Sequence, residues 1–190
     1  MAQKELENEL KNVAEQIETL RKKKIELLAK IGEKEMSDDY TFDNVDGTTV
    51  KFSELFGDRK YLFIVHSMGI SCGGCTIAGN SFNGTFKHIE KKGAFVFITV
   101  DPIETHKKLK EERGWKFRSA SCHGTTFAKD NDFWFEGKGN YPGVSVFEKL
   151  DNGKIKRLTY DYFEPAGFYD NYSHVINLLP TEDIKPIVAN

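Results

Sequence analysis

The feature that most constrains the fold of this chain is a pair of cysteines between a buried strand and a helix. Residues 61–66 form a nearly continuous apolar run, which is typical of a parallel strand covered on both faces. Cys72 and Cys75 follow, separated by two glycines, and residues 76–91 have the length and apolar spacing of a helix. The sequence therefore predicts a C-x-x-C pair at the start of a helix, just after a strand of a central sheet.

This position suits thiol chemistry, because a helix N-terminus presents unpaired N–H groups and a positive dipole end that stabilise a thiolate. We expect Cys72 to be the nucleophile, since it lies at the open end of the helix. Cys75, one turn in, should be more buried and should resolve a mixed disulfide formed on Cys72. Two inert buried cysteines are a weaker alternative, because the low helix propensity of Gly73 and Gly74 would destabilise a helix interior.

A metal site is a second alternative for the same cysteines. Zinc takes four protein ligands in structural sites, and a second C-x-x-C is absent from this sequence. Cys122 and His123 could complete such a site together with the pair. The residues alone leave this possibility open, although no metal is our first expectation.

The remaining elements follow from apolar periodicity and turn signals. We predict a hairpin of residues 40–42 and 48–52, a helical turn at 53–57, a buried strand at 94–100, a helix from Pro102 to about Arg113, a stretch that is mostly loop at 115–141, strands at 144–147 and 154–160, and a last helix at 167–179. This order predicts an α/β chain with a mixed central sheet and helices on both faces.

The first segment carries a heptad pattern of apolar residues. Its members are Leu6, Leu10, Val13, Ile17, Leu20, Leu27 and Ile31, with Lys24 at the one position that is not apolar. The pattern predicts a long N-terminal amphipathic helix, roughly 39 Å from Leu6 to Ile31, that ends at Gly32. It could lie across its own domain or form a dimerising coiled coil, and the sequence leaves both open. We expect residues 1–35 to form this helix and residues 36–190 the compact domain.

Composition and the first residues limit the partners and the compartment. A formal net charge of −2 gives no reason to expect nucleic acid or an anionic membrane as a partner. Residues 1–10 alternate charged and apolar side chains, so we expect neither a signal peptide nor a membrane anchor. We therefore expect a cytoplasmic protein, in whose reducing compartment a C-x-x-C pair is more often catalytic or metal-binding than structural.

A second candidate site feature is Tyr141-Pro142-Gly143, immediately before a predicted strand. A cis proline in this position would turn a bare backbone edge toward an extended substrate, while a plain trans proline is the default. Tyr141 and Pro142 are accordingly our candidates for substrate binding. Aromatic residues of the neighbouring stretch either floor a substrate groove or pack under a loop; these are Phe127, Phe133, Trp134, Phe135 and Tyr141.

Two further residues are auxiliary candidates. His66 ends the strand that leads to the cysteines and could act as a base or hold a charge near the thiolate, or could be a partly buried residue at a strand end. Cys122 could relay electrons to the pair, or could be a passive thiol.

Several segments together resemble a known family. The run from Phe42 through Asp46-Gly47 to Phe52-Ser53-Glu54-Leu55, followed by Cys72 and Cys75, is similar to the opening of the alkyl-hydroperoxide-reductase/thiol-specific-antioxidant branch of thioredoxin-fold proteins. Within this branch the chain most resembles a bacterial thioredoxin-like family of predicted dithiol–disulfide oxidoreductases. That resemblance rests on the heptad helix, Gly114-Trp115-Lys116-Phe117 with Ser119 and Ser121, residues 143–147, and the tail Thr159-Tyr160 to Leu178-Leu179-Pro180.

The resemblance implies a thioredoxin-like fold in which Cys72 attacks, Cys75 resolves and Pro142 lies on the substrate side. Ser71 and Gly74 replace the Trp and Pro that flank thioredoxin cysteines, so the direction of electron transfer stays open. The peroxiredoxin pattern Pro-x-x-x-Thr-x-x-Cys is not matched either: aligned on Cys75, its Pro and Thr positions hold Met68 and Cys72.

We therefore predict a dithiol–disulfide oxidoreductase without a cofactor. Its partners would be protein or small-molecule disulfides and a cellular thiol reductant, and it could dimerise through the N-terminal helix. The alternatives are a thiol peroxidase and a metal-binding or regulatory module without turnover.

Overall fold

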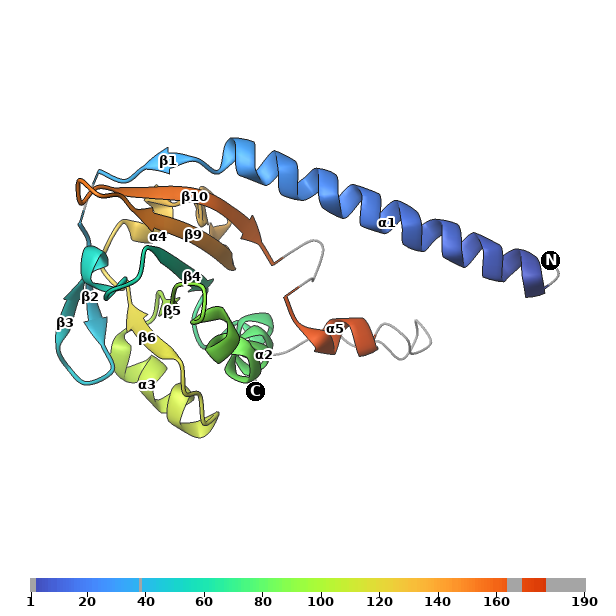
Figure 1. Ribbon diagram of the computed structural model, residues 1–190. Helices are drawn as coiled ribbons and strands as arrows, with labels where there is room; N and C mark the ends of the chain where they lie inside the picture. Colours follow the sequence, from blue (N-terminus) through green and yellow to red (C-terminus); the bar gives the residue numbers. More distant parts are fainter. Residues whose placement is uncertain (1–2, 38, 164–168, 177–190) are drawn as a thin grey trace.

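The computed structural model describes residues 3–37, 39–163 and 169–176, and its core is one eight-stranded mixed sheet (Figure 1). In spatial order the strands are β1 (Lys34–Glu35), β10 (Ile155–Tyr162), β9 (Gly143–Lys149), β4 (Tyr61–Ser67), β5 (Ala94–Thr99), β6 (Arg118–Ser121), β2 (Thr41–Asn44) and β3 (Thr49–Lys51). A separate hairpin pairs β7 (Trp134–Phe135) with β8 (Gly139–Asn140). The helices are α1 (Gln3–Ile31), η1 (Phe52–Glu54), α2 (Gly73–Ile89), α3 (Ile103–Glu112), α4 (Phe127–Asp130) and α5 (Asn171–Ile176).

The middle of the sheet is parallel and its margins are antiparallel. Strands β4, β5 and β6 run parallel to one another, joined by α2 and α3, whereas β9 pairs antiparallel with β4 and with β10. The predicted hairpin around Asp46-Gly47 is present as β2 and β3. The mixed α/β architecture expected from the sequence is thus confirmed.

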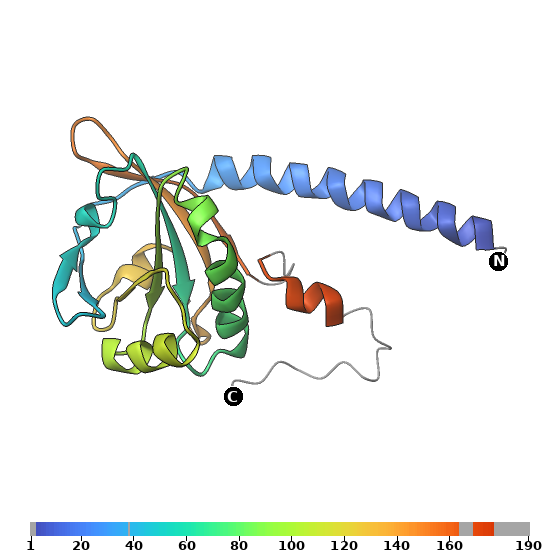
Figure 2. The same cartoon turned by 60° about the horizontal axis from the view of Figure 1, so that its bottom comes forward.

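Two hydrophobic clusters cover the two faces of the sheet. On one face α2 and α3 pack over the strands, where Phe97 and Phe117 stack 5.2 Å apart. The opposite face is covered by η1, α4 and the β2–β3 hairpin, with Phe127 fully buried between Phe42 and Phe52. Both long internal helices therefore share one face, as Figure 2 shows, and the other face is closed mainly by aromatic side chains.

The prediction that residues 115–141 are mostly loop is wrong in part. Strand β6 lies within this segment and pairs parallel with β5. Its residues alternate poorly because Ser119 and Ser121 are both buried, and the Ser121 hydroxyl donates a 2.5 Å hydrogen bond to the carbonyl of Asp101. A strand whose buried side chains are small and polar gives no apolar signal in the sequence.

The N-terminal helix projects away from the domain, so it does not lie across it (Figures 1 and 2). None of its residues is buried, and only Lys24 and Leu28 are partly covered. The carboxyl end of α1 is held closely, because a Cβ on Gly32 would lie 2.5 Å from the Cα of Thr159 in β10. Directly after it, Lys34 and Glu35 form strand β1 at the edge of the sheet.

The last predicted helix is observed only as α5, over residues 171–176; the rest of the prediction at 167–179 falls mostly outside the described residues. Among the helices that are described, none is both long and apolar enough to cross a membrane.

Candidate active site

The two cysteines lie at the amino end of α2, which begins three residues earlier than the sequence pattern indicated. Cys72 is the N-cap residue of the helix and Cys75 lies in its first turn. The two sulfurs are joined in a disulfide, with their Cα atoms 5.2 Å apart. Cys75 is only 2% exposed, whereas Cys72 is partly open to solvent. This is the difference in burial expected between an attacking and a resolving thiol.

Each sulfur atom of the disulfide accepts a hydrogen bond from a backbone amide. The N–H of Cys75 donates to Sγ of Cys72 over 3.0 Å, and the N–H of Met68 donates to Sγ of Cys75 over 3.4 Å. The first of these is the usual N-cap hydrogen bond, with a sulfur in place of the serine or aspartate oxygen. Because an anion accepts such bonds more strongly than a neutral thiol, the arrangement favours the thiolate form at Cys72 after reduction.

Asp101 holds the loop that leads into the disulfide, a role that our sequence analysis missed. Its Oδ2 accepts a 2.6 Å hydrogen bond from the N–H of Ile70. Gly69 has a φ of +98°, and a Cβ at that position would lie 2.5 Å from the Asp101 carboxylate, so only glycine fits there. Asp101 lies two residues after the end of β5, next to the end of β4, and this placement at the carboxyl edge of parallel strands is a usable sequence signal.

Tyr141 and Pro142 lie at the same edge of the sheet as the cysteine loop. Gly143 pairs with His66 at the end of β4, just before residues 67–71 turn toward Cys72. Pro142 is buried, and its carbonyl accepts a 3.0 Å hydrogen bond from the N–H of Phe163. The tertiary structure thus brings the Tyr141-Pro142 segment and the C-x-x-C segment to neighbouring strand ends.

His66 is buried in the core, with 4% of its surface exposed. Its ring stacks on Phe133 at 3.7 Å between centroids, and its Nε2 lies 2.9 Å from the Ser145 hydroxyl. Burial, helped by the positive charge of Arg157, lowers the pKa of His66 to about 3. The ring is therefore neutral near pH 7, and the structure gives no support to a charge on His66 beside the thiolate.

Cys122 is the one cysteine outside the disulfide, and it is buried. Its Sγ donates to the carbonyl of Thr99 over 3.3 Å, and burial raises the pKa of this thiol to about 12. Together with His66 it lines a cavity of about 10 Å³, which is no larger than a single water needs. Within the described part of the chain, no group of three or more His, Cys, Asp or Glu side chains is arranged to hold a metal ion.

The aromatic candidates separate into two groups. Phe127 and Phe133 belong to the interior, whereas Trp134 and Phe135 on the β7–β8 hairpin are 37% and 36% exposed. Phe135 meets Tyr141 edge to face at 5.7 Å. Of these four candidates, the two on the hairpin therefore offer exposed aromatic surface near the Tyr141-Pro142 segment.

Comparison with known protein families gives a match over most of the chain. The sequence profile of a family described as "Bacterial protein of unknown function (DUF899)" matches residues 1–170. The chain belongs to this family. The match includes α1 as well as the sheet and the cysteine pair, so the N-terminal helix is part of the family's shared sequence.

Similarity to individual proteins points to the wider superfamily. The chain is 25% identical over 148 residues to chloroplastic peroxiredoxin Q of Suaeda salsa, covering 77% of this chain and 68% of the relative. Among solved structures, peroxidoxin BcpB from Mycobacterium tuberculosis superposes with a TM-score of 0.55 at 20% identity, over 73% of this chain and 88% of that one. A peroxiredoxin-like protein from Aquifex aeolicus gives 0.55 at 15% identity, over 74% and 81%. These structures establish that the fold is thioredoxin-like.

Proposed function

We propose that this protein is a dithiol–disulfide oxidoreductase that works through Cys72 and Cys75. The observation that carries the proposal is the disulfide at the amino end of α2, in which Cys72, the partly exposed cysteine, accepts a hydrogen bond at Sγ from the N–H of Cys75. A solvent-accessible sulfur at a helix N-terminus is an activated nucleophile once it is reduced. The thioredoxin-like fold and the similarity to a peroxiredoxin Q support a redox function of this general kind.

The proposed reaction begins with the reduced pair. The Cys72 thiolate attacks one sulfur of a substrate disulfide, so that a mixed disulfide forms and the other substrate sulfur leaves as a thiolate. The Cys75 thiolate then attacks Sγ of Cys72, closes the intramolecular disulfide and releases the second substrate thiolate. The protein loses two electrons and the substrate gains them, and a cellular thiol reductant restores the dithiol.

We further propose that the Tyr141-Pro142 segment contacts the substrate chain. It lies at the strand end next to the one that leads to Cys72, and Phe135 of the neighbouring hairpin adds exposed aromatic surface. Asp101 acts as a positioning residue in this scheme, because it fixes the Gly69-Ile70 backbone ahead of the cysteines. We also propose a division of the chain into a helical segment of residues 1–35 and a domain of residues 36–190, with strand β1 joining the end of the first to the sheet of the second.

The roles of the two cysteines can be tested by trapping. Cys75→Ser should accumulate a mixed disulfide with a substrate protein, because the resolving thiol is missing. Cys72→Ser should trap little, and Cys122→Ser serves as a control that should behave as the parent protein does. If Cys72→Ser traps more strongly than Cys75→Ser, the assigned roles are reversed. If the purified protein binds zinc stoichiometrically and the pair does not cycle between dithiothreitol and oxidised glutathione, the metal-binding alternative is correct.

A thiol peroxidase is the second candidate, favoured by the similarity to peroxiredoxin Q. In that reaction the Cys72 thiolate would attack a peroxide, form a sulfenic acid and release an alcohol or water, and Cys75 would condense with it and expel water. Peroxide consumption with thioredoxin and its reductase supplied distinguishes the two functions. Rapid peroxide loss that disappears in Cys72→Ser would favour the peroxidase, whereas disulfide reduction without peroxide loss would favour the oxidoreductase.

A further inference from the structure

The N-terminal helix is left almost uncovered by its own domain. The apolar heptad residues Leu6, Leu10, Val13, Ile17, Leu20, Leu27 and Ile31, which we call the seam, are 44–70% exposed. In proteins most of the stability of a helix comes from packing its amphipathic face, and α1, with 29 residues, packs almost none of its face on its own domain. Four heptads are also enough for a coiled coil. The exposed seam therefore needs a partner along its whole length.

We propose that the partner is a second copy of this chain, whose α1 packs antiparallel along the seam. The distribution of charged residues along α1 favours a second copy of this helix as the partner. Residues 3–16 contain four Glu and two Lys, whereas residues 17–31 contain two Glu and five Lys or Arg. An antiparallel pair places the acidic half of each helix beside the basic half of the other, which is favourable for both.

The seam itself selects the orientation. With the pair centred between Ile17 and Leu20, Leu10 faces Leu27 of the partner subunit and Val13 faces Lys24 of the partner subunit. A parallel pair would instead place each Lys24 opposite Lys24 of the partner subunit, so that two lysines, and not a lysine and a valine, meet within the interface. Flanking the seam, Glu9 faces Lys30 of the partner subunit only in the antiparallel alignment.

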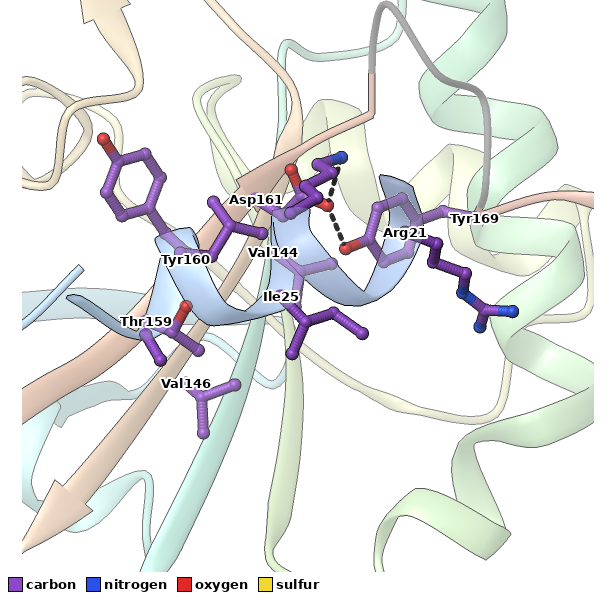
Figure 3. A pocket seen from close by; sticks show the side chains of 11 residues that line it. Arg21, Ile25, Val144, Val146, Thr159, Tyr160, Asp161 and Tyr169 are labelled. Carbon is purple, nitrogen blue, oxygen red and sulfur yellow. Dashed lines mark hydrogen bonds and ion pairs between the residues drawn. The ribbon is translucent and has the colours of Figure 1, made fainter. Parts of the chain in front are cut away.

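A groove beside the seam supports the same arrangement. It has a volume of about 320 Å³ and lies between the carboxyl half of α1 and strands β9 and β10, where Ile25, Val144 and Val146 contribute apolar surface (Figure 3). Lys24 lines this groove and also occupies the one seam position that is not apolar, and its ammonium lies 2.8 Å from the Asp161 carboxylate. The acidic amino half of the partner's α1 would run beside Arg21 and Lys24 and cover the groove.

The first test is the oligomeric state of the full chain by sedimentation velocity over a range of concentrations. The parent protein should be a dimer, and Leu20→Glu should raise its dissociation constant by about 100-fold or more, because each dimer buries this position twice. Glu15→Lys, on the outer face of the same helix, is the matched control and should leave the dimer intact. Far-UV circular dichroism checks that the domain stays folded in each variant. A monomeric parent protein overturns the proposal.

The second test decides orientation by charge reversal. Glu9→Lys should weaken the dimer by about 10-fold, since both copies lose an ion pair and gain a repulsion. Adding Lys30→Glu in the same chain should restore the dimer in an antiparallel pair. If the double variant is no tighter than the single one, the antiparallel alignment is wrong. The proposal does not depend on the redox function, because cycling of Cys72 and Cys75 can be measured separately in every variant.

Discussion

Two buried histidines should make this protein sensitive to mild acid. His66 and His106 are 4% and 2% exposed, and burial, helped by the positive charges of Arg157 and Lys110, lowers their pKa values to about 3 and about 4. In the unfolded chain both rings take up a proton near the usual pKa of 6.5. Below that pH the unfolded state therefore binds more protons than the folded state, and stability falls as the pH decreases.

The size of the effect follows from the two pKa differences. At pH 5 the unfolded rings are protonated and the folded rings are not, so each histidine costs about 2 kcal/mol of unfolding free energy, or about 4 kcal/mol together. This is a large part of the roughly 5–15 kcal/mol that stabilises a typical domain. Above pH 7 both rings are neutral in the folded and the unfolded state, so the two histidines cause no further change in the unfolding free energy.

Urea unfolding at pH 7, 6 and 5, followed by tryptophan fluorescence, measures this loss. His106→Gln removes one titrating ring and should cut the difference between pH 7 and pH 5 by about 2 kcal/mol. His88→Gln is the matched control, because His88 is exposed and should leave the pH dependence unchanged. Carboxylates contribute equally to all three proteins and cancel in the comparison. If His106→Gln and the parent protein lose the same free energy between pH 7 and pH 5, the argument from burial is refuted.

Three further predictions test packing and reactivity. Gly79→Ala should destabilise the protein by about 1–3 kcal/mol in chemical denaturation, because its Cβ would lie 2.5 Å from the buried ring of Trp115. Gly84→Ala on the same helix is the matched control: its Cβ would meet nothing within 4 Å, so this change should stabilise the protein by about 0.5–1 kcal/mol. Arg157→Met should cost about 3–5 kcal/mol by the same assay, since this 2% exposed guanidinium donates to the carbonyls of Gly32 and Asn131. In the reduced protein, iodoacetamide should leave Cys122 unmodified until the chain unfolds; labelling at the rate of an exposed thiol would contradict the raised pKa of this group.

The parts of the fold that the sequence predicted are those with a strong local signal. The continuous apolar run of β4, the alternation of β9 and the Asp46-Gly47 turn each specify their element through a few neighbouring residues. Strand β6 lacks such a signal, because Ser119 and Ser121 are buried polar residues whose place depends on β5 and Asp101. Tertiary hydrogen bonds, not periodicity, make this segment a strand.

The candidate site shows the same division. Cys72, Cys75 and Pro142 could be singled out by their spacing and by the elements next to them. The sequence could place Asp101 after a parallel strand, at the sheet edge where the cysteine loop begins, but it could not reveal the hydrogen bond to Ile70, which joins residues 31 positions apart. The interior place of His66, which makes its ring neutral, likewise depends on Phe133 and Ser145 from other strands and loops.

By itself, the sequence determined that a C-x-x-C pair follows a buried strand and begins a helix, and that a heptad helix precedes the domain. Periodicity and capping are local properties, so a few neighbouring residues suffice to encode them. Only the tertiary structure decided that this helix projects with its seam exposed, that Asp101 binds the cysteine loop, and that the Tyr141-Pro142 segment lies at the neighbouring strand end. These arrangements involve residues far apart in the chain, and they form only when the sheet brings the strand ends together.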